Sequence, residues 1–371
     1  MLFLAPGVSN GMLTNPSAAG MDIREVRVAI YTSVIEDYVI EVEQALDYAW
    51  EENGTYYKIS SSIIGREQVN GRETPSLNGD AFDVLIIPGS GRPYVDAADP
   101  WWRSAVRDFV ADGGGYVGIC GGANIASMGF RENWSINAVL NLSTLGIANV
   151  YVNDNQREEW QYLWKSNWEE GMPPIDVAIA RSDNPIFAGF FGERRSMRYG
   201  GGPGMYPTTV PCEECGKVTP LAVYAEEPME VAPLHFWRWR NGWEIMATIS
   251  TDVKGQYAAV ATSYGKGNVV LFGPHPEKPI WFGGHVEEFP VRPNAGPFTW
   301  FIYNWSNATL SLPSYNWWML RRAVAWAADA SLPQVMYGGA TAISGSLLSV
   351  NGHVVLPLPS GVLIGSVRRG V

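Results

Sequence analysis

The stretch GGGYVGICGGA, residues 113–123, decides the fold class of this sequence. Its apolar half, Tyr116 to Ile119, is typical of a buried strand, and the glycines around Cys120 allow a tight turn into a helix. A side chain at such a turn is held in a strained, exposed position that suits a nucleophile. The helix N-terminus that follows favours a thiolate and offers N–H groups to an anion. A buried cysteine at a strand end is the alternative interpretation.

Strands and helices alternate on the N-terminal side of this stretch. VRVAIYTS (26–33), YYKISSSII (56–64) and FDVLIIPGSG (82–91) have the β-branched, apolar character of strands. Residues 39–53 and 100–112 have helical spacing, the first ending at an Asn-Gly pair that resembles a helix C-cap. The alternation predicts an α/β fold: a doubly wound, mostly parallel, flavodoxin-like sheet with helices on both faces. Right-handed crossovers then place residues 88–91 beside Cys120.

A second chemical signal lies far downstream, in GNVVLFGPHPE (267–277). A strand there ends in His275-Pro276-Glu277. A cysteine nucleophile needs a base, and an imidazole needs an acceptor that fixes its tautomer. We therefore expect Cys120, His275 and Glu277 to form a triad; an exposed loop carrying a His and a Glu is the alternative.

The loop of residues 88–91 supplies the third signal. Backbone N–H groups of Gly89, Ser90 and Gly91, together with that of Gly121, are predicted to form an oxyanion hole. A plain turn is the alternative.

The rest of the chain has a simpler organisation. We expect residues 1–24 to be a flexible leader and residues 25–330 to form the α/β domain, closed by a helix around 315–330. Residues at about 150–231 form an irregular insertion within it. Residues 331–371 form a tail rich in Gly, Ser, Val and Leu, with short strands at most.

The three signals, in this order, resemble the class I glutamine amidotransferase superfamily, which includes the DJ-1/PfpI-like proteins. Within it the sequence is most similar to the N-terminal domain family of biotin-protein ligases, which has a GGGYxGICxGA-type elbow, a Tyr-Asn-Gly-Gly-Pro-type segment and a final His-Pro-Glu. RYGGGPGMY (198–206) matches the middle segment, with Gly200 where Asn is usual, and the first strand ends in YTSVIED instead of a Gly-Pro-Gly loop. The resemblance implies that Tyr199, Gly201 and Gly202 bind substrate.

The same resemblance implies that Cys120 attacks an amide or ester carbonyl, that His275 carries the proton and that Glu277 orients His275. The thioester formed would be hydrolysed or aminolysed, without a metal or an organic cofactor. No biotin-transferring catalytic domain is recognisable, so ligase activity is not implied.

Composition limits the partners. The net charge of −11 removes the electrostatic basis for nucleic-acid binding, and no segment has the apolar length of a membrane span. We expect a small-molecule or peptide amide substrate, and the sequence leaves room for a protein partner. The cytoplasm is the default location; five N-x-S/T sequons, at Asn53, Asn133, Asn141, Asn304 and Asn307, keep secretion as the alternative.

Three functional interpretations stay open at this point. The first is a Cys-dependent amide hydrolase or amidotransferase-like protein. The second is a binding or regulatory module that keeps the fold without turnover. The third is a redox or metal role for Cys212 and Cys215, which form a single CxxC; because a closed zinc site needs four ligands, an internal disulfide or two inert thiols fit them better. His235 is expected to be a packed or hydrogen-bonded histidine, and His285 is a candidate for the pocket wall.

Overall fold

The structure is a computed structural model, and it describes residues 22–33, 37–90, 93–132, 136–156, 172–180, 184–187, 192–290, 301–310, 314–334, 349–350, 353–358 and 361–365. The described chain divides into two compact units, the first ending at Gln334 and the second running from Val335 to Val371. The predicted leader lies almost wholly outside the described residues. The first strand begins at Asp22, three residues before the predicted start.

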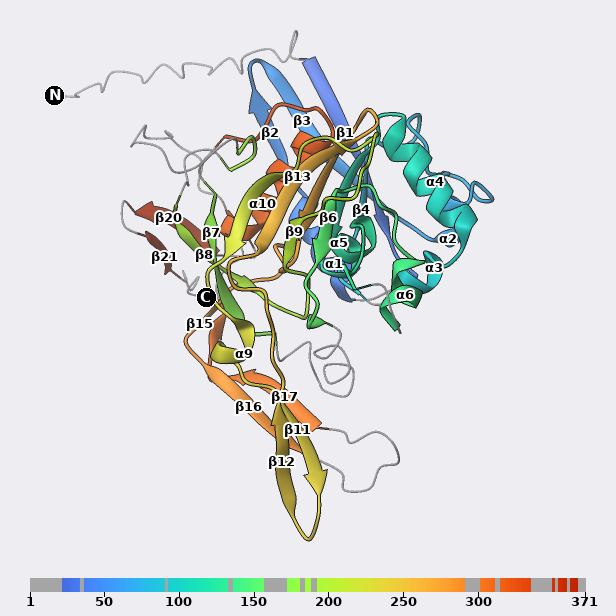
Figure 1. Cartoon of the computed structure of the whole chain (residues 1–371). Coiled ribbons are helices and arrows are strands. Elements are labelled where there is room, and N and C mark those ends of the chain that lie inside the picture. Colours follow the sequence, from blue (N-terminus) through green and yellow to red (C-terminus); the bar gives the residue numbers. More distant parts are fainter. Residues whose placement is uncertain are drawn as a thin grey trace, which may run out of the picture. The chain divides into compact units, whose positions relative to one another are not determined.

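The first unit holds most of the secondary structure (Figure 1). Its strands are β1 (Asp22–Tyr31), β2 (Ala49–Glu52), β3 (Thr55–Ile64), β4 (Val84–Ile87), β5 (Gly115–Ile119), β6 (Val150–Val152), β7 (Pro174–Ile179), β8 (Arg194–Arg198), β9 (Met205–Pro207), β10 (Thr219–Tyr224), β11 (His235–Trp239), β12 (Trp243–Thr248), β13 (Tyr257–Tyr264), β14 (Gly267–Phe272), β15 (Trp281–Phe282), β16 (His285–Pro290), β17 (Phe301–Ser306) and β18 (Thr309–Leu310). Its helices are α1 (Asp37–Leu46), α2 (Arg66–Val69), α3 (Pro93–Asp96), α4 (Pro100–Ala111), α5 (Gly121–Ala126), α6 (Ile136–Asn141), α9 (Pro228–Val231) and α10 (Ser314–Ala327).

A single large sheet forms the centre of the first unit. Its strand order is β2-β3-β1-β4-β5-β14-β13-β10-β7-β8, and β6 and β9 join it at β13. The strands β3, β1, β4, β5 and β14 run parallel to one another. The antiparallel strands flank this parallel centre. The fold is therefore the predicted α/β class, and the carboxyl ends of β4, β5 and β14 meet at one edge.

Alternating side chains on the central strands face two helical layers. On one face Ala29, Leu85 and Tyr116 join a core cluster that includes Trp102 and Phe109 of α4. Helices α1 and α10 pack against each other and against the same sheet. The strand residues between those of the first cluster, such as Ile30 and Ile86, are also fully buried. This burial on both faces explains why the strands read as continuous apolar runs instead of alternating ones.

Two segments differ from the sequence prediction. The predicted helix 39–53 ends at Leu46, and Ala49–Glu52 turns back as β2 against β3. Asn53 and Gly54 are the hairpin turn, with φ of 52° and 79°, because an Asn-Gly pair fits a two-residue hairpin better than a helix end. The span 150–231, predicted to be irregular, carries β6 to β10. Of these, β10, β7 and β8 extend the central sheet, since β10 pairs with β13.

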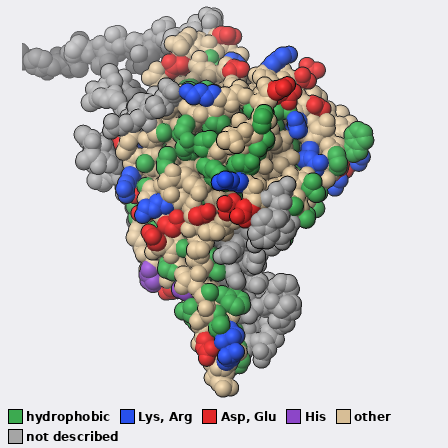
Figure 2. All heavy atoms as spheres, in the orientation of Figure 1, with side chains coloured by type: hydrophobic (Ala, Val, Ile, Leu, Met, Phe, Trp, Pro, Cys, Tyr) green, Lys and Arg blue, Asp and Glu red, His purple; other side chains and the backbone are tan. Residues whose placement is uncertain are grey.

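Two antiparallel ribbons extend together away from the sheet (Figure 1). They are β11–β12 and β16–β17, and His235 of the first donates its backbone N–H to Glu288 of the second. Figure 2 shows apolar, acidic and basic side chains intermixed at this end of the molecule. None of the described helices has the length and apolar character needed to cross a bilayer.

The second unit contains a three-stranded antiparallel sheet of β19 (Ser349–Val350), β20 (His353–Leu358) and β21 (Gly361–Gly365). It agrees with the expectation of short strands in this part of the chain.

Candidate active site

Cys120 stands at the turn between β5 and α5. Its φ of 51° and ψ of −106° lie outside the regions that a non-glycine residue normally adopts. The backbone N–H of Cys120 donates to the carbonyl of Phe272 on β14 at 2.7 Å, and the Cys120 carbonyl accepts from Asn124 of α5. Hydrogen bonds to β14 and to α5 therefore hold the strained turn in place. A Cβ on Gly121 would lie 1.8 Å from the Ser90 carbonyl oxygen, so only glycine fits there. The sequence thus produces a strained elbow that carries a nearly buried thiol, 7% exposed.

His275 and Glu277 lie where the chain leaves β14, and both are fully buried. The His275 N–H donates to the Arg198 carbonyl at 2.9 Å, which holds this segment against β8. His275 Nδ1 lies 2.6 Å from Glu277 Oε1. His275 Nε2 and Glu277 Oε2 make no ordinary hydrogen bond within the described part of the chain. The pair therefore has the geometry expected of the predicted base and its orienting carboxylate, and the second imidazole nitrogen is left available.

His275 and Glu277 each favour the charged form of the other. Burial lowers the pKa of His275, but the charges of Glu277 and Cys120 outweigh burial and raise that pKa from 6.5 to about 9. Burial raises the pKa of Glu277, and the charge and hydrogen bond of His275 bring it below its ordinary value. The geometry thus favours a protonated imidazole beside an ionised carboxylate.

The predicted oxyanion loop lies beside both the thiol and the imidazole. A Cβ on Gly89 would lie 2.4 Å from His275 Cε1 and 3.0 Å from Cys120 Cβ, so both side chains flank this glycine. Ser90 packs against Gly121 through its carbonyl. Gly121 is the first residue of α5, where N–H groups have no acceptor within the helix. Gly89, Ser90 and Gly121 therefore meet beside Cys120, while Gly91 lies outside the described residues.

The predicted substrate segment has a mixed outcome. A Cβ on Gly202 would lie 3.3 Å from Cys120 Cα, and the Gly201 carbonyl accepts from Gln156 at 2.9 Å. Tyr199, in contrast, is 1% exposed and packs edge-on against Tyr224, with ring centres 6.0 Å apart. The two glycines approach the centre, whereas the Tyr199 ring belongs to the core.

Sequence reasoning gave no site role to Gly200 or Met172, which also lie at the centre. The Gly200 carbonyl is 3.9 Å from Cys120 Sγ. A Cβ on Gly200 would meet Met172 Cε at 2.8 Å and His275 Nε2 at 3.1 Å. The position where the related family has Asn is therefore occupied by the thioether of Met172. The departure at Gly200 was visible in the sequence, but its replacement by a residue 28 positions earlier was not.

A layer of charged residues beside the triad was also missed. The Lys278 ammonium pairs with Glu41 of α1 and stands 4.4 Å from the centre of the Tyr38 ring. The Tyr38 ring centre is 5.9 Å from that of His275. Arg198 lies over the Trp281 ring, and burial lowers its pKa to about 10. The sequence contained one sign of this charged layer, because Lys278 directly follows Glu277 in the chain.

The remaining candidates lie elsewhere. Cys212 and Cys215 form a disulfide, which is the internal disulfide that the sequence analysis gave as one alternative for the CxxC. His235 pairs with Glu288, as expected for a hydrogen-bonded histidine. His285 is exposed and lies 3.6 Å from Glu287 on its own strand. No group of three His, Cys, Asp or Glu that could hold a metal ion occurs within the described ranges.

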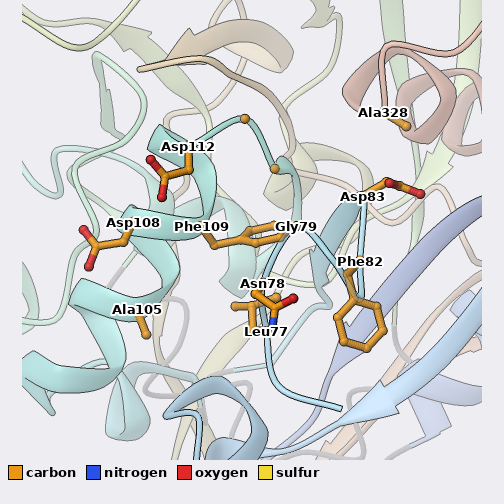
Figure 3. Close-up of a pocket in the computed structure, with 12 residues that line it drawn as sticks. Leu77, Asn78, Gly79, Phe82, Asp83, Ala105, Asp108, Phe109, Asp112 and Ala328 are labelled. Carbon is orange, nitrogen blue, oxygen red and sulfur yellow. The ribbon is translucent and has the colours of Figure 1, made fainter. Parts of the chain in front are cut away.

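A cavity of about 460 Å³ opens at the opposite edge of the sheet, before the first residues of β4 and β5. Figure 3 shows Asp108 and Phe109 of α4, and Asp112 directly after it, on one side of this cavity and Phe82 and Asp83 on the other. Gly113 and Gly114 complete its wall. None of the residues of the candidate triad lines it, so the cavity is separate from the candidate site at Cys120.

A family model described as "Biotin-protein ligase, N terminal" matches residues 79–287, more than half of the 371-residue chain. No curated protein matches the chain. Among solved structures, PurLQS from Thermotoga maritima is 16% identical, with a TM-score of 0.37 over 68% of this chain and 88% of that one. A glutamine amidotransferase from Thermotoga maritima is 15% identical, with a TM-score of 0.34 over 68% of this chain and 76% of that one. A β-galactosidase from Bacillus circulans is 13% identical, with a TM-score of 0.34 over 67% of this chain and 28% of that one.

Proposed function

The chain belongs to the biotin-protein ligase N-terminal family, which is class I glutamine amidotransferase-like, and from that premise we propose that it is a Cys-dependent amide hydrolase or amidotransferase-like protein. One observation carries the proposal: Cys120 stands on a strained strand-to-helix turn, and the buried His275–Glu277 pair flanks the same glycine, Gly89. A thiol, a base and an orienting carboxylate in this arrangement are the parts of acyl transfer through a thioester.

The reaction begins with the thiol proton on His275. The Cys120 thiolate attacks the carbonyl carbon of a small-molecule or peptide amide, and a C–S bond forms. The oxyanion that develops accepts hydrogen bonds from backbone N–H groups of the Gly89–Ser90 loop and of Gly121. Glu277 holds Nδ1 of His275, so that Nε2 faces the reacting atoms.

The second half of the reaction returns the proton. The His275 imidazolium protonates the leaving nitrogen, the C–N bond breaks and an amine or ammonia departs, which leaves an acyl thioester on Cys120. Water or an acceptor amine then attacks the thioester, His275 takes the proton of that nucleophile, and the thiolate is released. Every proton moves through one imidazole, so the residues proposed here need no metal or organic cofactor.

A binding or regulatory module without turnover is the second candidate. The burial of the triad favours it, because Cys120 is 7% exposed and the His275 and Glu277 side chains have no exposed surface. The fold supports either role.

The rate of Cys120 alkylation by a small reagent at neutral pH separates the two candidates. In the enzyme, Cys120 reacts faster than an ordinary cysteine, because the imidazolium of His275 favours the reactive thiolate. His275→Ala lowers the rate, because the stabilising imidazolium is gone. Glu277→Gln lowers it less, and the exposed His285→Ala serves as the matched control without effect. Alkylation of Cys120 at the rate of an ordinary thiol, unchanged by these substitutions, rejects the triad and leaves the binding module.

A further inference from the structure

Helix α1 carries two residues that face the candidate triad from outside it. Tyr38 and Glu41 are three positions apart and so lie on one side of the helix. Tyr38 is 3% exposed, and its ring lies 5.9 Å from the His275 ring. Glu41 pairs with Lys278, whose side chain is only 7% exposed. Through Tyr38 and Glu41, helix α1 therefore contributes to the layer of charged residues that lies beside His275 and Glu277.

Lys278 pairs with the carboxylate of Glu41 and interacts through charge with the carboxylate of Glu277. It follows Glu277 in the chain, and its backbone N–H contacts the His275 carbonyl at 3.4 Å in a tight turn. Its ammonium is bound by Glu41 and lies over the Tyr38 ring. Glu277 Oε2 is buried and has no hydrogen-bond partner in the part of the chain that is described. A buried ammonium that loses its carboxylate must find another, and Glu277 Oε2 is adjacent in the chain and unused.

We propose that Glu41 is a positioning residue for the His275–Glu277 pair: it holds the Lys278 ammonium over Tyr38 and away from Glu277, so that Glu277 serves His275 alone. The inference rests on the proposed roles of His275 and Glu277. Without Glu41, Lys278 turns to Glu277, competes with the imidazole for the carboxylate and weakens the protonated state of His275.

Other charged and polar groups also act on the His275–Glu277 pair, and they must be the same in every variant that is compared. Glu277 and Cys120 face His275 and favour its protonated state, and Glu41 also interacts with it through charge. Arg198 of β8 faces Glu41, Tyr38 and Glu277. From α10, Trp317 donates its indole N–H to the Glu277 carbonyl at 2.6 Å. Because Arg198 and Trp317 remain in every variant below, their contributions cancel between variants.

A double-mutant cycle isolates the positioning effect. The proteins are the full chain and its variants Glu41→Gln, Lys278→Gln and the double variant, with the exposed Glu43→Gln on the same helix as the matched control. The readouts are the NMR titration midpoint of the His275 ring and the far-downfield proton of its short Nδ1 hydrogen bond.

We expect Glu41→Gln to lower the His275 midpoint by about one pH unit, the size of a neighbouring charge effect, and to weaken the Nδ1 signal. The double variant recovers the Nδ1 signal, because no ammonium remains to compete for Glu277. The two single effects on the midpoint are then non-additive. Simple additivity, with the Nδ1 signal unchanged in Glu41→Gln, overturns the proposal, because Glu41 would then act by charge alone.

A further variant covers the case in which Glu41→Gln does not fold. Glu41→Asp keeps the charge and shortens its reach, so it lowers the midpoint without a change of net charge; an unchanged midpoint in Glu41→Asp overturns the proposal. The outcome is separable from the proposed function. A non-additive cycle with an unreactive Cys120 rejects the enzyme and keeps the role of Glu41, whereas a reactive Cys120 with an additive cycle does the reverse.

Discussion

Replacing Glu277 by Gln should remove a large pH dependence from the stability of the folded protein. The folded pKa of His275 is raised to about 9 from an ordinary value of 6.5. Because the folded state binds this proton more tightly, the stabilisation is fully present below pH 6.5 and is lost as the pH rises through 9. The difference of about 2.5 units, at about 1.4 kcal/mol per unit, corresponds to about 3 kcal/mol.

In Glu277→Gln the main charge that favours the imidazolium is gone and burial remains. Cys120 still raises the His275 pKa against burial, so this pKa falls from about 9 and the contribution of His275 between pH 6.5 and 9 becomes smaller. Urea unfolding of both proteins at intervals from pH 6 to pH 9.5 measures the effect. The quantity compared is the difference between the two unfolding free energies at each pH. Contributions from groups that titrate alike in both proteins cancel in this difference.

We expect the wild-type protein to be more stable than Glu277→Gln by up to about 3 kcal/mol at pH 6, with the gap narrowing toward pH 9.5. His285→Gln is the control, since this exposed histidine should leave the wild-type curve unchanged. Parallel stability curves for wild type and Glu277→Gln, with a constant gap across this range, would refute the reasoning. They would mean that His275 is not held protonated by Glu277.

Two further predictions concern the parts around the site. A chain cut after Gln334 should unfold as cooperatively as the full chain, whereas a cut after Ala330 should lose about 2–4 kcal/mol in urea unfolding. The shorter chain lacks the Ser331 hydrogen bonds to Trp50 and Tyr57 and leaves the buried Arg322 without the Pro333 carbonyl; equal stability of the two truncations would contradict this account. Replacing both Cys212 and Cys215 by Ser should lower the unfolding free energy by about 2 kcal/mol, the loop-closure value for so short a loop, and leave the alkylation rate of Cys120 unchanged. A change in that rate would show that the disulfide acts on the site.

The parallel centre of the fold could be predicted from the sequence because each strand there is a short apolar run that ends in turn residues. Residues 82–91 and 113–123 contain both signals, and they fixed the position of Cys120 beside the Gly89–Ser90 loop. The flanking strands gave weaker signals. Ala49–Glu52 continues the helical spacing of α1, and only its pairing with β3 makes it a strand.

The candidate triad could be predicted for the same local reason, since Cys120 follows a strand and His275 follows another. The residues around it could not. Glu41 and Lys278 are far apart in the sequence, and no periodic pattern links a helix position to a turn after β14. Met172 reaches Gly200 through the tertiary fold alone. Tyr199 was assigned to the site from its motif, and the motif carried no signal that its ring is buried against Tyr224.

The most direct test of the central claim is intact-protein mass spectrometry after brief exposure to a glutamine-like electrophile at neutral pH. The account predicts a single adduct, located on Cys120, that forms at least tenfold more slowly in His275→Ala and is absent from Cys120→Ala; tenfold corresponds to about 1.4 kcal/mol of lost activation. Adducts that form at the same rate in wild type and His275→Ala, or that label the reduced Cys212 and Cys215 as fast as Cys120, would contradict it.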